Sequence, residues 1–171
     1  MRTISCDSLD AVGDLSEFSL PVRLFLRAYP WRRIDPLPWT PLGKPLAECR
    51  VALVSSAGLV PAGDQPFDDT VRGGDWSWRP IPEDVDLTAM VDSHRSESFD
   101  HTGLAADRNL VFPRDRLREL AAARRIAALA PRHASFMGSI SAPGRLVSRT
   151  APAIAEMLLA DQVDVGLLVP V

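Results

Sequence analysis

The fold is decided at residues 50–58, which read RVALVSSAG. The residues from Val51 to Val54 are apolar without alternation, which is typical of a strand buried on both faces of a parallel sheet. The small residues from Ser55 to Gly58 predict a tight turn at the carboxyl end of this strand. Because ligand sites of open α/β sheets gather at that edge, the stretch also predicts where a site lies.

A second apolar stretch, VDVGLLVPV, occupies residues 163–171. It predicts another parallel strand that is buried on both faces. The helix expected before it has Thr150 as its N-cap and an apolar face made by Ile154, Met157 and Leu158. Together the two strands and this helix predict an α/β fold with an open three-layer, mostly parallel sheet of the Rossmann or flavodoxin type.

The segment between the two apolar strands predicts three further elements. Residues 75–79 alternate in type and predict a short edge strand. Pro113 is suited to the first turn of a helix that carries Leu117 and Leu120 on one face. Residues 125–130 predict a second short helix.

The first 48 residues predict an irregular, proline-rich arm that precedes an α/β domain over residues 49–171. Residues 21–29 predict a short amphipathic helix within this arm. Five prolines between positions 30 and 45 exclude a regular helix there. We expect an extended arm anchored by its tryptophans, with a proline-rich motif for a partner domain as the alternative.

Composition excludes several classes of protein. The net charge of −3 argues against a nucleic-acid binder, because phosphate binding needs a basic face. No apolar run approaches the ~20 residues needed to cross a bilayer, and the N-terminus lacks the apolar core of a signal peptide. Cys6 and Cys49 have no metal or redox spacing, so we expect two reduced thiols in a cytoplasmic protein.

The last predicted strand ends without a helix to follow it. A parallel strand normally runs into a crossover helix that covers the sheet, whereas no residue follows Val171 in this sequence. An apolar strand left at a sheet edge is an aggregation hazard. We therefore expect the α/β domain to be truncated at its C-terminus, with an oligomer that covers the edge as the alternative.

Several segments over residues 40–171, taken in order, carry a family resemblance. They are KPLAE (44–48), VALVSSAGL (51–59), PFD (66–68), GDWSWRPIP (74–82), SH (93–94), DH (100–101), DRNLVFP (107–113), DRLREL (115–120), APRHASFMG (130–138) and LVPV (168–171). In this order they resemble the selenoprotein B-type subunit of the glycine/sarcosine/betaine/D-proline reductase family.

The resemblance implies a redox active site. Complete family members have selenocysteine or cysteine, two further residues and then cysteine after the corresponding strand, so this motif is expected directly after Val171. A UGA selenocysteine codon read as a stop would explain its absence. A selenol or thiol at a strand-to-helix turn has its pKa lowered by the helix dipole, and the second cysteine can resolve an oxidised form.

The implied activity is that of an oxidoreductase subunit in amino-acid metabolism, which cleaves an amine reductively from an amino-acid-like substrate. No cofactor is expected in this chain, while a pyruvoyl group is expected on a partner reductase subunit. The other expected partners are a small amine substrate or a second copy of the chain, but no nucleic acid and no membrane. The alternative is a non-catalytic α/β module that binds a ligand or partner.

Two groups of residues are candidates for the site. His94, His101 and His133 are candidates for acid–base catalysis, because histidine titrates near neutral pH. A structural hydrogen bond is the alternative for each, and the histidine spacing is not that of a standard zinc site.

The second group follows the first strand. The backbone N–H groups of Ser55, Ser56 and Gly58 are candidates for binding a substrate carboxylate. A plain tight turn is the alternative.

Overall fold

The structure is a computed structural model in which the chain divides into two units, residues 1–41 and residues 42–171. The residues that it describes are 15–29, 34–38, 40–96 and 99–171.

The first unit contains the predicted short helix. Helix α1 spans Leu20–Ala28 with Pro21 in its first turn, where the missing N–H costs nothing. Its side chains are exposed or only partly covered. The described residues between 34 and 45 form no regular helix, as the prolines predicted. The predicted anchors Trp31 and Trp39 lie outside the residues that the structure describes.

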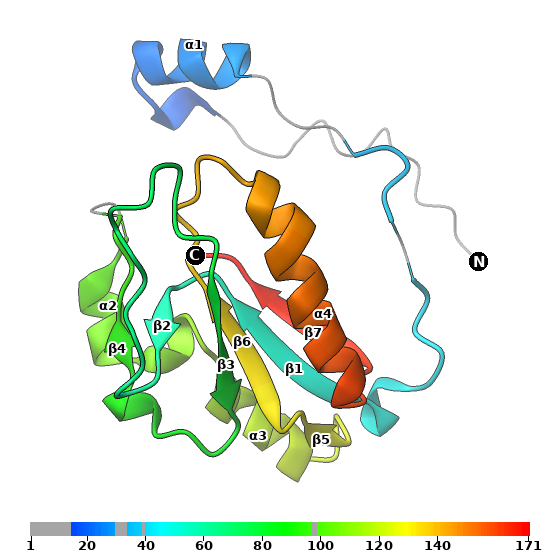
Figure 1. The fold of residues 1–171 in the computed structure, drawn as a ribbon. Helices are drawn as coiled ribbons and strands as arrows, with labels where there is room; N and C mark the ends of the chain where they lie inside the picture. Colours follow the sequence, from blue (N-terminus) through cyan, green and yellow to red (C-terminus); the bar gives the residue numbers. More distant parts are fainter. Residues whose placement is uncertain (1–14, 30–33, 39, 97–98) are drawn as a thin grey trace. The chain divides into compact units, whose positions relative to one another are not determined.

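The second unit is built on a five-stranded, mostly parallel sheet (Figure 1). Its strands are β1 (Arg50–Ser55), β3 (Trp78–Pro82), β5 (Ala128–Leu129), β6 (Arg132–Phe136) and β7 (Val165–Val169). Strand β3 pairs antiparallel with β6, and the other pairings are parallel. A two-stranded antiparallel sheet is formed by β2 (Leu59–Val60) and β4 (Val91–Asp92). The α-helices of this unit are α2 (His101–Ala106), α3 (Arg114–Ala122) and α4 (Ala151–Ala160).

The pairing of β1 determines the order of the parallel strands. Val51 pairs with both Leu129 and Val165, so β5 and β7 lie on opposite edges of β1. Val54 likewise pairs with both β6 and β7, so β5 and β6 share one edge. They form one interrupted strand, with Pro131 in the gap. The parallel order is therefore β5/β6, β1, β7, which in chain order is 2-1-3, the order with which flavodoxin-like sheets begin.

Helices cover both faces of the sheet. Val51 and Leu53 of β1 point into a core shared with Leu104 of α2 and Leu117 of α3. Val54 points to the other face, in a cluster that includes residues of α4. Figure 1 shows α4 in front of the sheet, with α3 behind it. This arrangement confirms the predicted open three-layer α/β fold.

The predicted helix over residues 125–130 is wrong. The chain reverses at Arg124, whose φ is 56°, and enters β5 almost at once. The N–H of Ala127 donates to the carbonyl of Cys49, and the N–H of Ala130 donates to that of Val51. The ladder with β1 thus satisfies backbone groups that one short helical turn would leave largely unpaired.

Thr150 does not cap α4, so that prediction is also wrong. A π-helical turn over Leu146–Thr150 precedes α4, and Thr150 already has helical dihedral angles. Its buried hydroxyl donates to the carbonyl of Trp76 instead. The hydroxyl therefore donates to a distant carbonyl, whereas the hydroxyl of an N-cap accepts a local backbone N–H.

The expected burial of the last strand on both faces is contradicted. Leu167 is 41% exposed and Leu168 is 70% exposed, whereas Val165 and Val169 pack partly against the core beneath α2 and α3. Among the described residues β7 pairs with β1 alone, and α4 covers only part of its other face. The strand itself was predicted correctly.

The structure bears on the expectations about a membrane span and about the two cysteines. None of the helices in the described ranges is long and apolar enough to cross a bilayer. Cys49 is a buried free thiol, and Cys6 lies outside the described residues.

Gly74 lies in a loop where the close approach of a neighbouring segment requires glycine, and this requirement can be tested. Replacing Gly74 with alanine should destabilise the protein by about 2–4 kcal/mol, because its φ is 101° and an added Cβ would lie 2.8 Å from the backbone of Ser139 and Ile140. Gly63→Ala is the matched control, since φ there is 89° but no atom lies within 4 Å of the added Cβ. It should cost only about 1 kcal/mol. Equal losses in urea unfolding would contradict the steric explanation.

Candidate functional site

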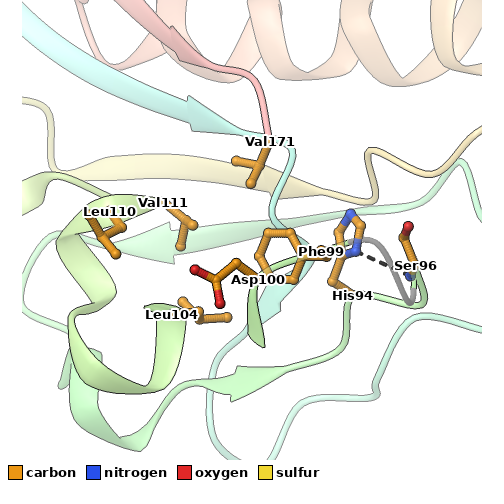
Figure 2. Close-up of a pocket in the computed structure, with 8 residues that line it drawn as sticks. All are labelled: His94, Ser96, Phe99, Asp100, Leu104, Leu110, Val111 and Val171. Carbon is orange, nitrogen blue, oxygen red and sulfur yellow. Dashed lines mark hydrogen bonds between the residues drawn. The ribbon is translucent and has the colours of Figure 1, made fainter. Parts of the chain in front are cut away.

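An open cleft of about 470 Å³ lies at the carboxyl ends of β1 and β7 (Figure 2). It is lined by His94, Ser96, Phe99, Asp100, Leu104, Leu110, Val111 and Val171. Val171 stands two residues beyond β7, and the carbonyl of Val111 accepts a 2.7 Å hydrogen bond from the Ser55 hydroxyl at the end of β1. In a 2-1-3 sheet the strand order reverses between these two strands, which is where open α/β sheets bind ligands.

The segment that carries His94 is held against the turn after β1. Strand β4 pairs with β2, which follows that turn directly. The N–H of Ser93 donates to the carbonyl of Gly58 at 3.2 Å. Gly58 has a φ of 65°, and an added Cβ would lie 3.3 Å from the backbone of His94. Glycine at this position therefore allows both the turn and the close approach.

Asp92 ties His94, which lines the cleft, to His101, whose ring centroid lies 6.5 Å from that of His94 but which is not part of the lining. One of its carboxylate oxygens accepts the backbone N–H of His94 at 3.0 Å, and the other lies 2.5 Å from Nδ1 of His101. Nε2 of His101 faces the carbonyl of Ser96 at 3.2 Å. Both ring nitrogens of His101 thus face acceptors, which suits the imidazolium form. The Asp92 carboxylate accordingly raises the pKa of His101.

His94 has the opposite tendency. Burial lowers its pKa, the Asp92 charge acts against this shift, and nearby His101 adds to it. Its Nδ1 accepts the N–H of Ser96 at 3.3 Å, so Nε2 carries the proton in the neutral ring. Within the described chain this Nε2 is buried and has no hydrogen-bond partner. The ring stacks on Phe99 with centroids 4.2 Å apart. A histidine with a raised pKa and one with a lowered pKa therefore stand next to each other.

His133 is not brought to the cleft. It is fully buried in β6, where its Nδ1 accepts the N–H of Leu53 at 3.1 Å. Its ring packs edge-on against Phe112, with centroids 5.7 Å apart. Burial lowers the pKa of His133 to about 4. This geometry is that of a neutral histidine which completes the sheet at the interruption between β5 and β6.

The backbone N–H groups of the turn after β1 already have hydrogen-bond acceptors within the protein. Those of Ser56 and Gly58 donate to the carbonyls of Val169 and Phe136, at 3.1 and 3.0 Å. The hydroxyl of Ser55 accepts the N–H of Ala57 at 3.2 Å. These donors point into the protein, as the tight-turn alternative requires. Carboxylate binding by Ser55, Ser56 and Gly58 stays a prediction, and it would need these bonds to break.

Sequence reasoning missed most of the cleft lining. The bond between Asp92 and His101 spans nine residues, and no local pattern predicts it. Phe99, Leu104 and Val111 read as ordinary core residues. Among the described residues no group of three or more His, Cys, Asp and Glu side chains is placed to hold a metal ion.

The strand order and the cleft at its reversal point define an α/β domain with a flavodoxin-like beginning and a cleft at the carboxyl edge, where such sheets bind ligands. The chain belongs to the glycine/sarcosine/betaine reductase selenoprotein B family, whose model matches residues 20–170. This confirms the resemblance seen in the sequence.

Two relatives carry names that describe reductase subunits. The chain is similar to the D-proline reductase subunit gamma of Acetoanaerobium sticklandii, with 38% identity over 136 residues, which cover 79% of this chain and 54% of the relative. It is also similar to the glycine reductase complex component B subunit gamma of Symbiobacterium thermophilum, with 32% identity over 54% of this chain and 21% of the relative. The chain thus spans about half the length of the first relative and about a fifth of the second. No solved structure matches the chain.

Proposed function

We propose that the protein is a subunit of a selenol- or thiol-dependent reductase that cleaves an amine reductively from a small amino-acid-like substrate. The observation that carries this proposal is the cleft at the β1–β7 reversal point, whose lining includes both Val171 and His94. Family membership supports the reaction class, and the names of both relatives support it further.

The proposed nucleophile is the selenocysteine or cysteine that the family resemblance implies directly after Val171. Val171 lies at the edge of the cleft, beside Phe99 and Val111 in Figure 2, so the next residue would enter the same cleft. Its selenolate or thiolate attacks the α-carbon as the C–N bond breaks, and the amine leaves with the electron pair and a proton. The second cysteine then attacks the selenium or sulfur, the carbon takes up the electron pair and a proton, and a dithiol reductant restores the enzyme.

His94, which lines the cleft, and His101, which stands next to His94, fit different parts of this reaction. His101, whose pKa is raised by the Asp92 carboxylate, is the proposed acid that gives the leaving amine its proton. His94 is the proposed neutral wall of the cleft, with a polar Nε2–H beside the stacked Phe99 ring. His133 is the remaining candidate, and its burial limits it to a supporting role in this proposal.

The proposed partners follow from the names of the relatives, since both are gamma subunits. We extend the proposal to a cytoplasmic complex with a partner reductase subunit. A pyruvoyl group on that partner, implied by the family resemblance, would hold the substrate amine.

Reading the gene beyond the Val171 codon tests the proposal first. A UGA or cysteine codon, with a cysteine codon three positions later, is expected. The full-length protein should then react with a labelled haloacetamide at that residue, and the alkylated protein should lose dithiol-dependent reduction of glycine, sarcosine, betaine and D-proline. Another codon with no cysteine nearby, or the absence of any readily alkylated residue, would favour the non-catalytic binding module.

A further inference from the structure

The backbone hydrogen bonding between β1 and β7 ends one residue after β1, at Ser56. The N–H of Ser56 donates to the carbonyl of Val169 at 3.1 Å, which continues the parallel ladder. In such a ladder the carbonyl of the same residue would accept from the N–H two positions further along the partner strand, which is that of Val171. The carbonyl of Ser56 instead accepts the N–H of Gly138 at 2.8 Å, on the side of β6.

The side chain of Ser56 replaces this lost acceptor. The N–H of Val171 donates to the Ser56 hydroxyl oxygen at 2.9 Å, and the hydroxyl lies 3.4 Å from the carbonyl oxygen of Val171. Pro170, between the ladder and this contact, has no N–H to donate. Ser56 is only 9% exposed, so water competes little for these bonds. Among the described contacts, this hydroxyl is what holds Val171 after the ladder ends.

The same turn also holds the opposite wall of the cleft. Two residues beyond Ser56, Gly58 accepts the N–H of Ser93 and lies against the backbone of His94. Gly138 closes the turn from behind, because an added Cβ there would lie 2.8 Å from the Ser56 carbonyl oxygen and 3.1 Å from its hydroxyl oxygen. One rigid turn therefore sets the position of Val171 relative to His94.

We propose that Ser56 is a positioning residue whose hydroxyl anchors Val171 and so directs the reactive residue that follows it toward His94 in the cleft. This inference rests on the proposed function. It assigns Ser56 a different role from substrate binding, since its hydroxyl contacts the backbone of Val171, beyond the end of β7, and Ser56 does not line the cleft.

Ser56→Ala in the full-length reductase tests the role. We expect kcat to fall about 10- to 100-fold with KM unchanged, because a displaced nucleophile slows the chemical step while the cleft lining stays in place. The amide of Val171 should also exchange with solvent faster. Ser135→Ala is the matched control, since Ser135 is also a buried serine but its hydroxyl has no hydrogen-bond partner in the described structure. It should change neither quantity.

A second variant displaces the same hydroxyl without removing it. Gly138→Ala should also lower kcat, whereas Gly144→Ala should not, because nothing lies within 4 Å of a Cβ added there. Wild-type kcat in Ser56→Ala and Gly138→Ala would overturn the positioning role, and a raised KM with unchanged kcat would assign Ser56 to substrate binding instead. Absence of an alkylatable residue in the wild-type protein would overturn the proposed function itself, whatever the exchange rate at Val171.

Discussion

At pH 4 the protein should be about 3 kcal/mol less stable than at pH 7 because of His133 alone. The pKa of His133 is about 4 in the folded protein, against 6.5 for an unperturbed histidine. Between pH 4 and pH 6.5 the His133 side chain is mostly protonated in the unfolded chain and mostly neutral in the folded protein. Stability therefore falls as the pH drops from about 6.5 to about 4, and this contribution is constant outside that window.

The cause is a hydrogen bond that only a neutral ring can accept. Nδ1 of His133 accepts a hydrogen bond from the N–H of Leu53 in β1. Because the neighbouring strand is interrupted between β5 and β6, it offers this N–H no backbone carbonyl. Protonation would place two N–H groups face to face inside the sheet, beside the ring of Phe112. The charged form is therefore excluded by burial and by the loss of this acceptor.

His133→Asn should flatten the acid limb of the stability profile. The amide oxygen of asparagine stands close to where Nδ1 of histidine stands, so it can accept the same N–H without titrating. Unfolding free energies measured in urea at pH 7 and pH 4.5 give the comparison. His101→Asn is the control, since His101 is exposed and its raised pKa contributes no loss of this kind at acid pH. Identical pH profiles for the wild-type protein and His133→Asn would refute the assignment.

The largest effect on activity is expected at His101. In the full-length reductase, His101→Gln should lower kcat by about 100-fold or more, because the leaving amine loses its proton donor. The donor form of His101 exists below its pKa, and the carboxylates of Asp92 and Asp100 raise that pKa while neighbouring His94 carries no charge of its own near neutral pH. Wild-type kcat should therefore fall as the pH rises through the raised pKa of His101, above the ordinary histidine value of 6.5.

Asp92→Asn removes the negative charge beside His101 and leaves the imidazole ring in place. The neutral amide can no longer raise the pKa of His101, so the alkaline limb of the kcat profile should move to lower pH. Asp86→Asn is a suitable control, because Asp86 is an exposed cap that accepts the N–H of Thr88 and does not line the cleft. An unshifted limb in Asp92→Asn would show that His101 is not the acid.

Local pattern was enough for the elements that carry a strong signal of their own. The apolar runs at 51–54 and 165–169 predicted β1 and β7, and the amphipathic stretch at 21–29 predicted α1. The same runs led to the α/β class, and the ordered segments led to the family. Each of these strands and helices could be predicted from residues close together in the chain, because burial of an apolar side chain needs no particular partner.

Long-range hydrogen bonds decided everything that the pattern missed. Residues 125–130 became β5 because β1 offered them a ladder. Asp92 and His101 met across nine residues, and Ser56 met Val171 across 115. A hydrogen bond requires one specific partner at about 3 Å, and which partner arrives there depends on the whole packed sheet. The turn after β1 was therefore predicted as a turn, but only the folded chain shows that it holds Val171 and His94 in place.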